Sequence, residues 1–227
     1  PDQREMVANF RCNELKEEAL ALVKPQVAEL QAAADSALVE GFAAKCERIL
    51  GAARDFYADV AKQYAREVFE KVRGELEETL TQSLYQCFDS QLKMLRKQSY
   101  DKVTSEVRKL EAKPLDEVGD RLSEILTKLV EASIGSYERK ADALVPAGSG
   151  WEQKVSLHKQ ELQGQLDLVV QTCKDKLLAE VARTSQKVHE DHIKQFLYER
   201  VNSLGDELAA ELKDAYVQQV ELFNENL

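Results

Sequence analysis

The sequence predicts an all-α protein, an elongated antiparallel helical bundle with long helices. Apolar residues recur at steps of three or four over long stretches, which is the period of a helix, and no comparable stretch alternates as a strand would. The chain has only 9 Gly and 4 Pro in 227 residues, so its elements should be long and its connections short. Charged residues make up 32% and hydrophobic residues 44%, which excludes intrinsic disorder and allows a sizeable core.

The pattern predicts helices in chain order at about residues 3–23, 27–72, 75–111, 115–144, 151–202 and 206–225. The first helix should end or kink at Pro25, because proline disfavours a helical residue before it. Gly41, Gly51 and Gly74 are points where a bend is expected, and Gly205 should punctuate the last long stretch. Neighbouring helices should run antiparallel, because the connections are too short to return along a long helix.

The most regular apolar stripe lies in the predicted helix 75–111. Its members are Leu76, Leu80, Leu84, Phe88, Leu92, Leu95, Val103, Val107 and Leu110. Most steps are four residues, so the stripe drifts around a helix that has 3.6 residues per turn. A drifting stripe favours a helix that changes neighbours along its length, as in a multi-helix bundle, over a straight two-stranded coiled coil.

Proline and glycine mark the connections. Pro114 reads as a helix restart, and the clearest loop is 146–150, where Ser149 and Glu152 have the spacing of a capping box. These breaks divide the chain into an N-terminal helix (1–25), a first helical-bundle segment (26–145), a loop (146–150) and a second helical-bundle segment (151–227). The hinge candidates are Pro25, Pro114, Gly148 and Gly150.

The charge balance excludes several kinds of partner. A net charge of -10 repels phosphate, so we expect no nucleic acid and no docking on anionic lipid. No stretch approaches the roughly 18 apolar residues that span a bilayer, and there is no signal peptide, so we expect no direct membrane insertion. The basic residues Lys93, Arg96 and Lys97 spread around one helical turn and are interpreted as a solvated face.

No pattern of catalysis is present. There is no Gly-rich phosphate loop, so we expect no enzyme activity and no catalytic, cofactor-binding or metal-binding residues in this chain. His189 and His192 could share a helix face and hold a metal, but a complete site needs a third ligand, and a histidine at the bundle edge bonded to a carboxylate is the simpler account. Trp151 is either a partner anchor or, more simply, a cover for the end of the bundle. The remaining candidates are the cysteines, which are interpreted as free buried thiols: Cys12, Cys46, Cys87 and Cys173.

Three stretches resemble the Root Hair Defective family of dynamin-like GTPases, which fuse endoplasmic reticulum membranes and are counterparts of atlastin. The opening run, residues 1–14, resembles the segment that follows the GTPase domain, and its triplet Phe10-Arg11-Cys12 is the most specific part. Residues 88–97 resemble the family's Phe-x-x-Gln-Leu-Lys-x-Leu-Arg-Lys pattern, and 41–45 is a weaker third match.

The resemblance implies that the chain is the helical stalk between a GTPase domain and a membrane anchor. GTP and Mg would then belong to the upstream domain, and Phe10, Arg11 and Cys12 are the candidates for the junction with it. The implied partners are that GTPase domain and a second copy of the parent in an opposing membrane. The implied location is the cytoplasmic face of the endoplasmic reticulum membrane. The alternative is a free-standing cytosolic scaffold, spectrin-like or BAR-like, but we find neither repeats of constant length nor a basic membrane-facing surface.

Overall fold

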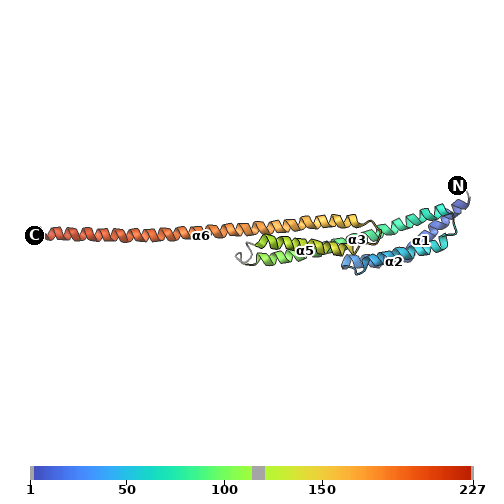
Figure 1. Ribbon diagram of the computed structural model, residues 1–227, viewed down its shortest axis with the longest axis horizontal. Coiled ribbons are helices and arrows are strands. Elements are labelled where there is room, and N and C mark those ends of the chain that lie inside the picture. Colours follow the sequence, from blue (N-terminus) through green and yellow to red (C-terminus); the bar gives the residue numbers. More distant parts are fainter. Residues whose placement is uncertain (1–2, 114–120, 226–227) are drawn as a thin grey trace. The chain divides into compact units, whose positions relative to one another are not determined.

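The structure is a computed structural model that describes residues 3–113 and 121–225, with the side chains of 222–225 left aside. The described residues form helices α1 (Gln3–Ser36), α2 (Phe42–Ala61), α3 (Arg66–Glu111), α5 (Leu122–Asp142) and α6 (Glu152–Glu225), and within these ranges there is no strand (Figure 1). The all-α prediction is therefore confirmed. None of the described helices combines the length and apolar character needed to cross a bilayer.

Several predicted helix boundaries are wrong. The expected single helix 27–72 is the end of α1, all of α2 and the start of α3, with turns at 37–41 and 62–65. Gly41 makes the first turn with φ of 64°, a left-handed conformation that a helix interior does not allow. The apolar period continues through this turn because both helices bury the same face, and periodicity does not reveal a reversal of the chain.

Pro25, Gly74 and Gly205 break no helix, although a break was expected near each of them. Pro25 lies inside α1, exposed, between the buried residues Val23 and Leu30. Packing on both sides of Pro25 therefore outweighs the cost of one missing backbone hydrogen bond. Gly74 and Gly205 lie inside α3 and α6 in the same way, so the expected boundaries near 74 and 205 are also wrong.

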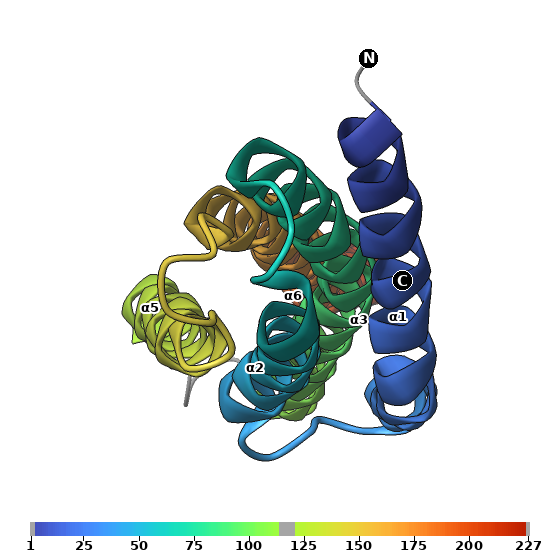
Figure 2. The same ribbon diagram turned by 90° about the vertical axis from the view of Figure 1, so that its right-hand side faces the viewer.

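The chain divides into two compact units, residues 1–171 and 172–227. In the first unit, α1, α2 and the first half of α3 pack as a three-helix bundle, and Figure 2 shows these helices side by side. Ring contacts from Tyr57 to Phe69 and from Phe42 to Phe88 show that α2 runs antiparallel to α3. Bonds from Lys16 to Glu75 and from Cys87 to Gln31 show that α1 runs parallel to α3.

The second half of α3 packs with α5 and the start of α6. Lys154 pairs with Asp89 and Arg96 pairs with Glu161, so α6 runs parallel to α3 here. α5 packs against α3 and is joined to α6 by an ion pair of 2.6 Å between Lys159 and Glu138. The described part of the first unit therefore contains two three-helix bundles that share α3. The domain boundaries at 25, 145 and 150 stay predictions.

The second unit consists of the remainder of α6, described here by itself. Its side chains are exposed over most of its length, including many large apolar ones. They recur at steps of three or four and are Ile193, Leu197, Val201, Leu204, Leu208 and Leu212.

Candidate functional site at the junction of the two bundles

One segment of α3, residues 88–96, takes part in both bundles, and we call it the junction segment. Its apolar members Phe88, Leu92 and Leu95 are almost completely buried, as expected from the stripe. The same segment contains the polar residues Asp89, Gln91, Lys93 and Arg96. Because a helix turns about 100° per residue, these polar side chains leave the helix toward different neighbours.

Gln91 is completely buried and binds the end of α1. Its side-chain amide donates to the carbonyl oxygens of Ala34, at 2.9 Å, and Ala37, at 2.8 Å, and its Oε1 accepts from the backbone N–H of Val39 at 2.6 Å. The last carbonyls of a helix have no partner within the helix. Gln91 therefore caps α1 from the side and fixes the chain that leads into α2.

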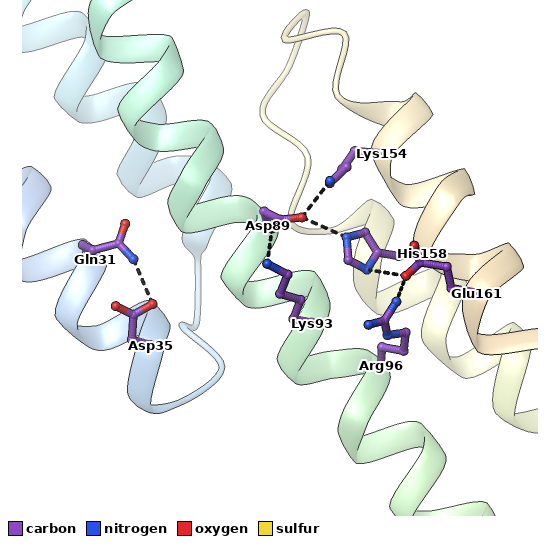
Figure 3. Close-up of polar contacts among 8 residues, drawn as sticks. All are labelled: Gln31, Asp35, Asp89, Lys93, Arg96, Lys154, His158 and Glu161. Carbon is purple, nitrogen blue, oxygen red and sulfur yellow. Dashed lines mark hydrogen bonds and ion pairs between the residues drawn. The ribbon is translucent and has the colours of Figure 1, made fainter. Parts of the chain in front are cut away.

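Asp89 binds the start of α6 (Figure 3). Its Oδ1 accepts from Lys154 Nζ and from His158 Nε2, both at 2.9 Å, while its Oδ2 pairs with Lys93 Nζ at 2.7 Å. Burial alone would raise the pKa of the Asp89 carboxyl, but the bonds from Lys93, Lys154 and His158 outweigh it and hold this pKa well below its usual range. Asp89 is therefore a carboxylate that joins two helices.

His158 is the buried imidazole of this cluster, and only 3% of it is exposed. Desolvation lowers the pKa of His158, and the cations Arg96 and Lys154 act in the same direction, against the attraction of Asp89. The neutral ring then donates Nε2–H to Asp89, while Nδ1 lies 3.8 Å from Glu161 Oε2 and has no hydrogen-bond partner among the described residues. Glu161 itself pairs with Arg96 across the same interface.

Aromatic rings join the two bundles at the same level. The Phe88 ring lies 6.2 Å from that of Phe42 on α2 and 5.0 Å from that of Trp151 at the start of α6. Trp151 also meets Tyr85 edge to face, with centroids 5.5 Å apart. Trp151 is 5% exposed, so it covers α3 where α6 begins, as its simpler interpretation predicted.

The residues expected from the sequence lie elsewhere. Phe10, a candidate for the junction with the GTPase domain, is 64% exposed, while Cys12 is buried and Arg11 pairs with Glu14 at 2.5 Å. Their role at a junction stays a prediction. Gly148 and Gly150 adopt φ of 67° and 71°, Pro25 lies within α1, and Pro114 lies outside the described residues. Their role as hinges also stays a prediction.

Two local interpretations are wrong. The hydroxyl of Ser149 has no hydrogen-bond partner within the described ranges, so the capping box with Glu152 does not form. Arg96 is not part of a solvated face, because its side chain is 22% exposed and pairs with Glu161. The sequence analysis did not predict the junction, because it assigned these residues either to a solvated surface or to the apolar stripe. Two signals could have indicated it: the polar Gln91 beside the stripe and the resemblance of 88–97 to a family pattern.

The chemistry of this site is structural. Within residues 3–113 and 121–225, no group of three or more His, Cys, Asp or Glu side chains could hold a metal ion, and His189 and His192 are both exposed. The four cysteines are buried and form no disulfide within the described residues, as predicted. Asp89 and Glu161 already form ion pairs with lysine and arginine side chains, and these pairs join α3 to α6. The cluster therefore positions the two helices.

The fold and the site together define the class of protein: a helical-bundle domain with a polar junction between two bundles. Residues 40–227 match the family model described as the Sey1 three-helix bundle domain, and the chain belongs to this family. The family membership expected from the sequence is thereby confirmed. The match includes the junction segment, while the triplet 10–12 precedes it.

Curated relatives agree with this membership. The chain is 26% identical over 174 residues to Protein SEY1 homolog 1 of Paramecium tetraurelia, which covers 75% of this chain and 22% of that protein. It is 26% identical over 176 residues to Protein sey1 of Emericella nidulans, which covers 71% of this chain and 20% of that protein. The chain thus spans about a fifth of the length of these relatives. No solved structure matches it.

Proposed function

We propose that the chain is the helical stalk of a membrane-anchored, dynamin-like GTPase that fuses endoplasmic reticulum membranes with one another. Membership of the Sey1 three-helix bundle family and the resemblance to the Root Hair Defective family support this function. The chain itself is not the enzyme. GTP and Mg act in an upstream domain of the longer parent, and the stalk lies on the cytoplasmic face of the membrane.

The observation that carries the proposal is the continuity of α3 through two bundles. Its 46 residues extend about 69 Å at 1.5 Å per residue. A single helix that is packed on one set of partners in its first half and on another set in its second half resists bending at the boundary between them. Such an element is suited to transmit a displacement, and rigid-body movement of packed helices is a known mode of switching.

The start of α1 is the proposed contact with the GTPase domain. Met6, Val7 and Phe10 are 60%, 59% and 64% exposed, and together they form an apolar patch on the first turns of α1. Arg11, beside this patch, pairs with Glu14. In the proposed mechanism, GTP-driven pairing of two parents in opposing membranes moves the GTPase domains, and this contact passes the movement into α1.

The experiment uses the full-length parent in liposomes. GTP should produce lipid mixing between two liposome populations, and replacement of residues 40–227 by a flexible linker of similar length should abolish the mixing while GTP hydrolysis persists. The matched control is the parent without GTP. Lipid mixing that is independent of this segment would contradict a stalk function, and a parent without GTP hydrolysis would contradict the assignment to a fusion GTPase.

A further inference from the structure

The junction segment presents two independent sets of polar contacts, one to each bundle. On one side Gln91 binds Ala34, Ala37 and Val39. On the other side Asp89 binds Lys154 and His158. Asp89 and Gln91 are two residues apart on α3, so both bundles are fixed at the same level of one helix.

Apolar packing alone would leave the axial position of the neighbours weakly determined. The α3 stripe repeats at nearly every turn through Leu76, Leu80 and Leu84, and burial of apolar area is not directional. A neighbour displaced by one turn, about 5.4 Å, would again find leucine opposite its own apolar stripe. Side-chain shape opposes such a shift, but hydrogen-bonding groups oppose it more specifically.

Gln91 has this specificity because only one position along α1 can satisfy it. The carbonyls of Ala34 and Ala37 are at the end of the helix, and the N–H of Val39 is in the turn that follows. One turn earlier along α1, backbone carbonyls accept from the helix itself. A displaced α1 would therefore leave the buried amide of Gln91 unsatisfied, which is costly for a polar group with no access to water.

The Asp89 side has the same property for α6. His158 is buried, and its Nε2 reaches Asp89 while Arg96, two turns further along α3, pairs with Glu161. A displaced α6 would separate both pairs at once and would leave the ionised, partly buried Asp89 carboxylate without its two donors from α6, Lys154 and His158.

We propose that the junction segment is a register lock: Gln91 selects the axial position of α1 and α2 on α3, and Asp89 selects that of α6. Buried polar groups are known to fix register in coiled coils at some expense of stability. The lock does not depend on the proposed function, since it is a property of the described residues alone. Within a stalk, it would keep an axial displacement of one bundle from being absorbed by slippage along α3.

The experiment measures distances in the 227-residue chain by pulsed electron spin resonance. Labels are attached through a ketone-bearing unnatural amino acid, so the buried cysteines stay unmodified. Exposed positions Glu18 on α1 and Lys97 on α3 report on α1, because Lys97 is far along α3 from the Lys16–Glu75 contact. Exposed positions Lys71 on α3 and Gln160 on α6 report on α6 in the same way.

Gln91→Met keeps the side-chain volume and removes the hydrogen bonds. It should add a second population to the 18–97 distance, displaced by about 5 Å, the rise of one helical turn, and leave the 71–160 distance single. Asp89→Leu should do the reverse. Gln98→Met, at an exposed glutamine of the same helix, is the control and should change neither distance.

A single, unchanged 18–97 distance in folded Gln91→Met, or a single, unchanged 71–160 distance in folded Asp89→Leu, overturns the proposal. Failure of either variant to fold overturns it as well, because that residue would then determine stability instead of choosing between registers. Second populations in both distances of each variant would overturn the independence of the two sides.

Discussion

At the scale of single residues, His158 makes the stability of the first unit depend on pH. Its imidazole is buried beside Asp89, and desolvation lowers its pKa from the ordinary value of 6.5. Below pH 6.5 the unfolded chain binds a proton at this residue that the folded chain does not bind. The free energy of unfolding must therefore fall as the pH falls through this range.

His158→Gln tests this dependence. A glutamine can donate an amide hydrogen to Asp89 without titrating, so the variant should lose less stability than the wild type between pH 7.5 and pH 5.5. Urea unfolding at the two pH values measures the difference, and the other titrating groups cancel in the comparison. Equal losses in the two chains would mean that His158 has an ordinary pKa.

Below about pH 4, Asp89 should cause a further loss of stability in both chains, since its pKa is held low only in the folded state.

Leu84 tests the core of the first bundle. It is completely buried in the middle of the α3 stripe, so Leu84→Asp would bury a charge with no partner and should destabilise the fold by on the order of 5 kcal/mol. Leu22→Asp, at a residue that is 49% exposed on α1, is the matched control and should change stability by about 0.5 kcal/mol or less. A circular-dichroism melt in which the two variants behave alike would contradict the assignment of Leu84 to the core.

The role of a residue was predictable where its burial follows the helical period. It was not predictable where its partners come from other helices. The burial of Leu84 follows from its place in the stripe, and so does that of Leu92. The roles of Gln91 and Arg96 depend on the end of α1 and on Glu161, which lie 52 or more residues away in the sequence. No local pattern contains those partners, so the sequence offered only two indirect signals of the junction: the polar Gln91 beside the stripe and the resemblance of 88–97 to a family motif.

At the scale of helices and turns, replacement of glycine by alanine should change the stability of the fold in opposite directions at two positions. Gly74 lies inside α3 with open space around an added Cβ, so Gly74→Ala should stabilise the fold by about 0.5–1 kcal/mol. Gly150 has φ of 71° and equally open space, so Gly150→Ala should destabilise it by about 1–2 kcal/mol through backbone strain alone. Chemical unfolding of both variants gives the comparison, and shifts of the same sign would contradict the backbone assignments.

Helix class was predictable at this scale, but helix ends were not. The period of three to four residues predicts helix on both sides of residue 41 and cannot distinguish one long helix from two that fold back on one another. Gly41 was expected to bend a helix and makes a complete turn instead. Pro25 was expected to end a helix and does not, because Val23 and Leu30 anchor α1 on either side. Tertiary packing decides both cases.

At the scale of the whole molecule, the proposal assigns nucleotide chemistry to another part of the parent. The isolated chain should therefore neither bind nor hydrolyse GTP, because its sequence has no Gly-rich phosphate loop and residues 3–113 and 121–225 contain no strand to present one. Titration with a fluorescent GTP analogue tests this, with the full-length parent as the positive control. Micromolar affinity in the isolated chain would show that this domain has a nucleotide site of its own.

The central claim is that the stalk transmits movement because it is stiff and is joined stiffly to the GTPase domain. A Gly/Ser linker inserted before Met6 in the full-length parent would behave as a random coil and would interrupt this connection. The matched control is the same linker inserted into the loop 62–65 between α2 and α3, which leaves α1 continuous with the GTPase domain and keeps its direct packing against α3, including the bond from Gln91 to Ala34.

The most direct measurement is lipid mixing and phosphate release, recorded side by side on the parent with the linker before Met6. The account predicts that phosphate release persists, because the chemistry lies upstream, while lipid mixing is lost, because movement of the GTPase domain no longer reorients the stalk. Near-normal lipid mixing would contradict the account and would make the stalk a passive tether.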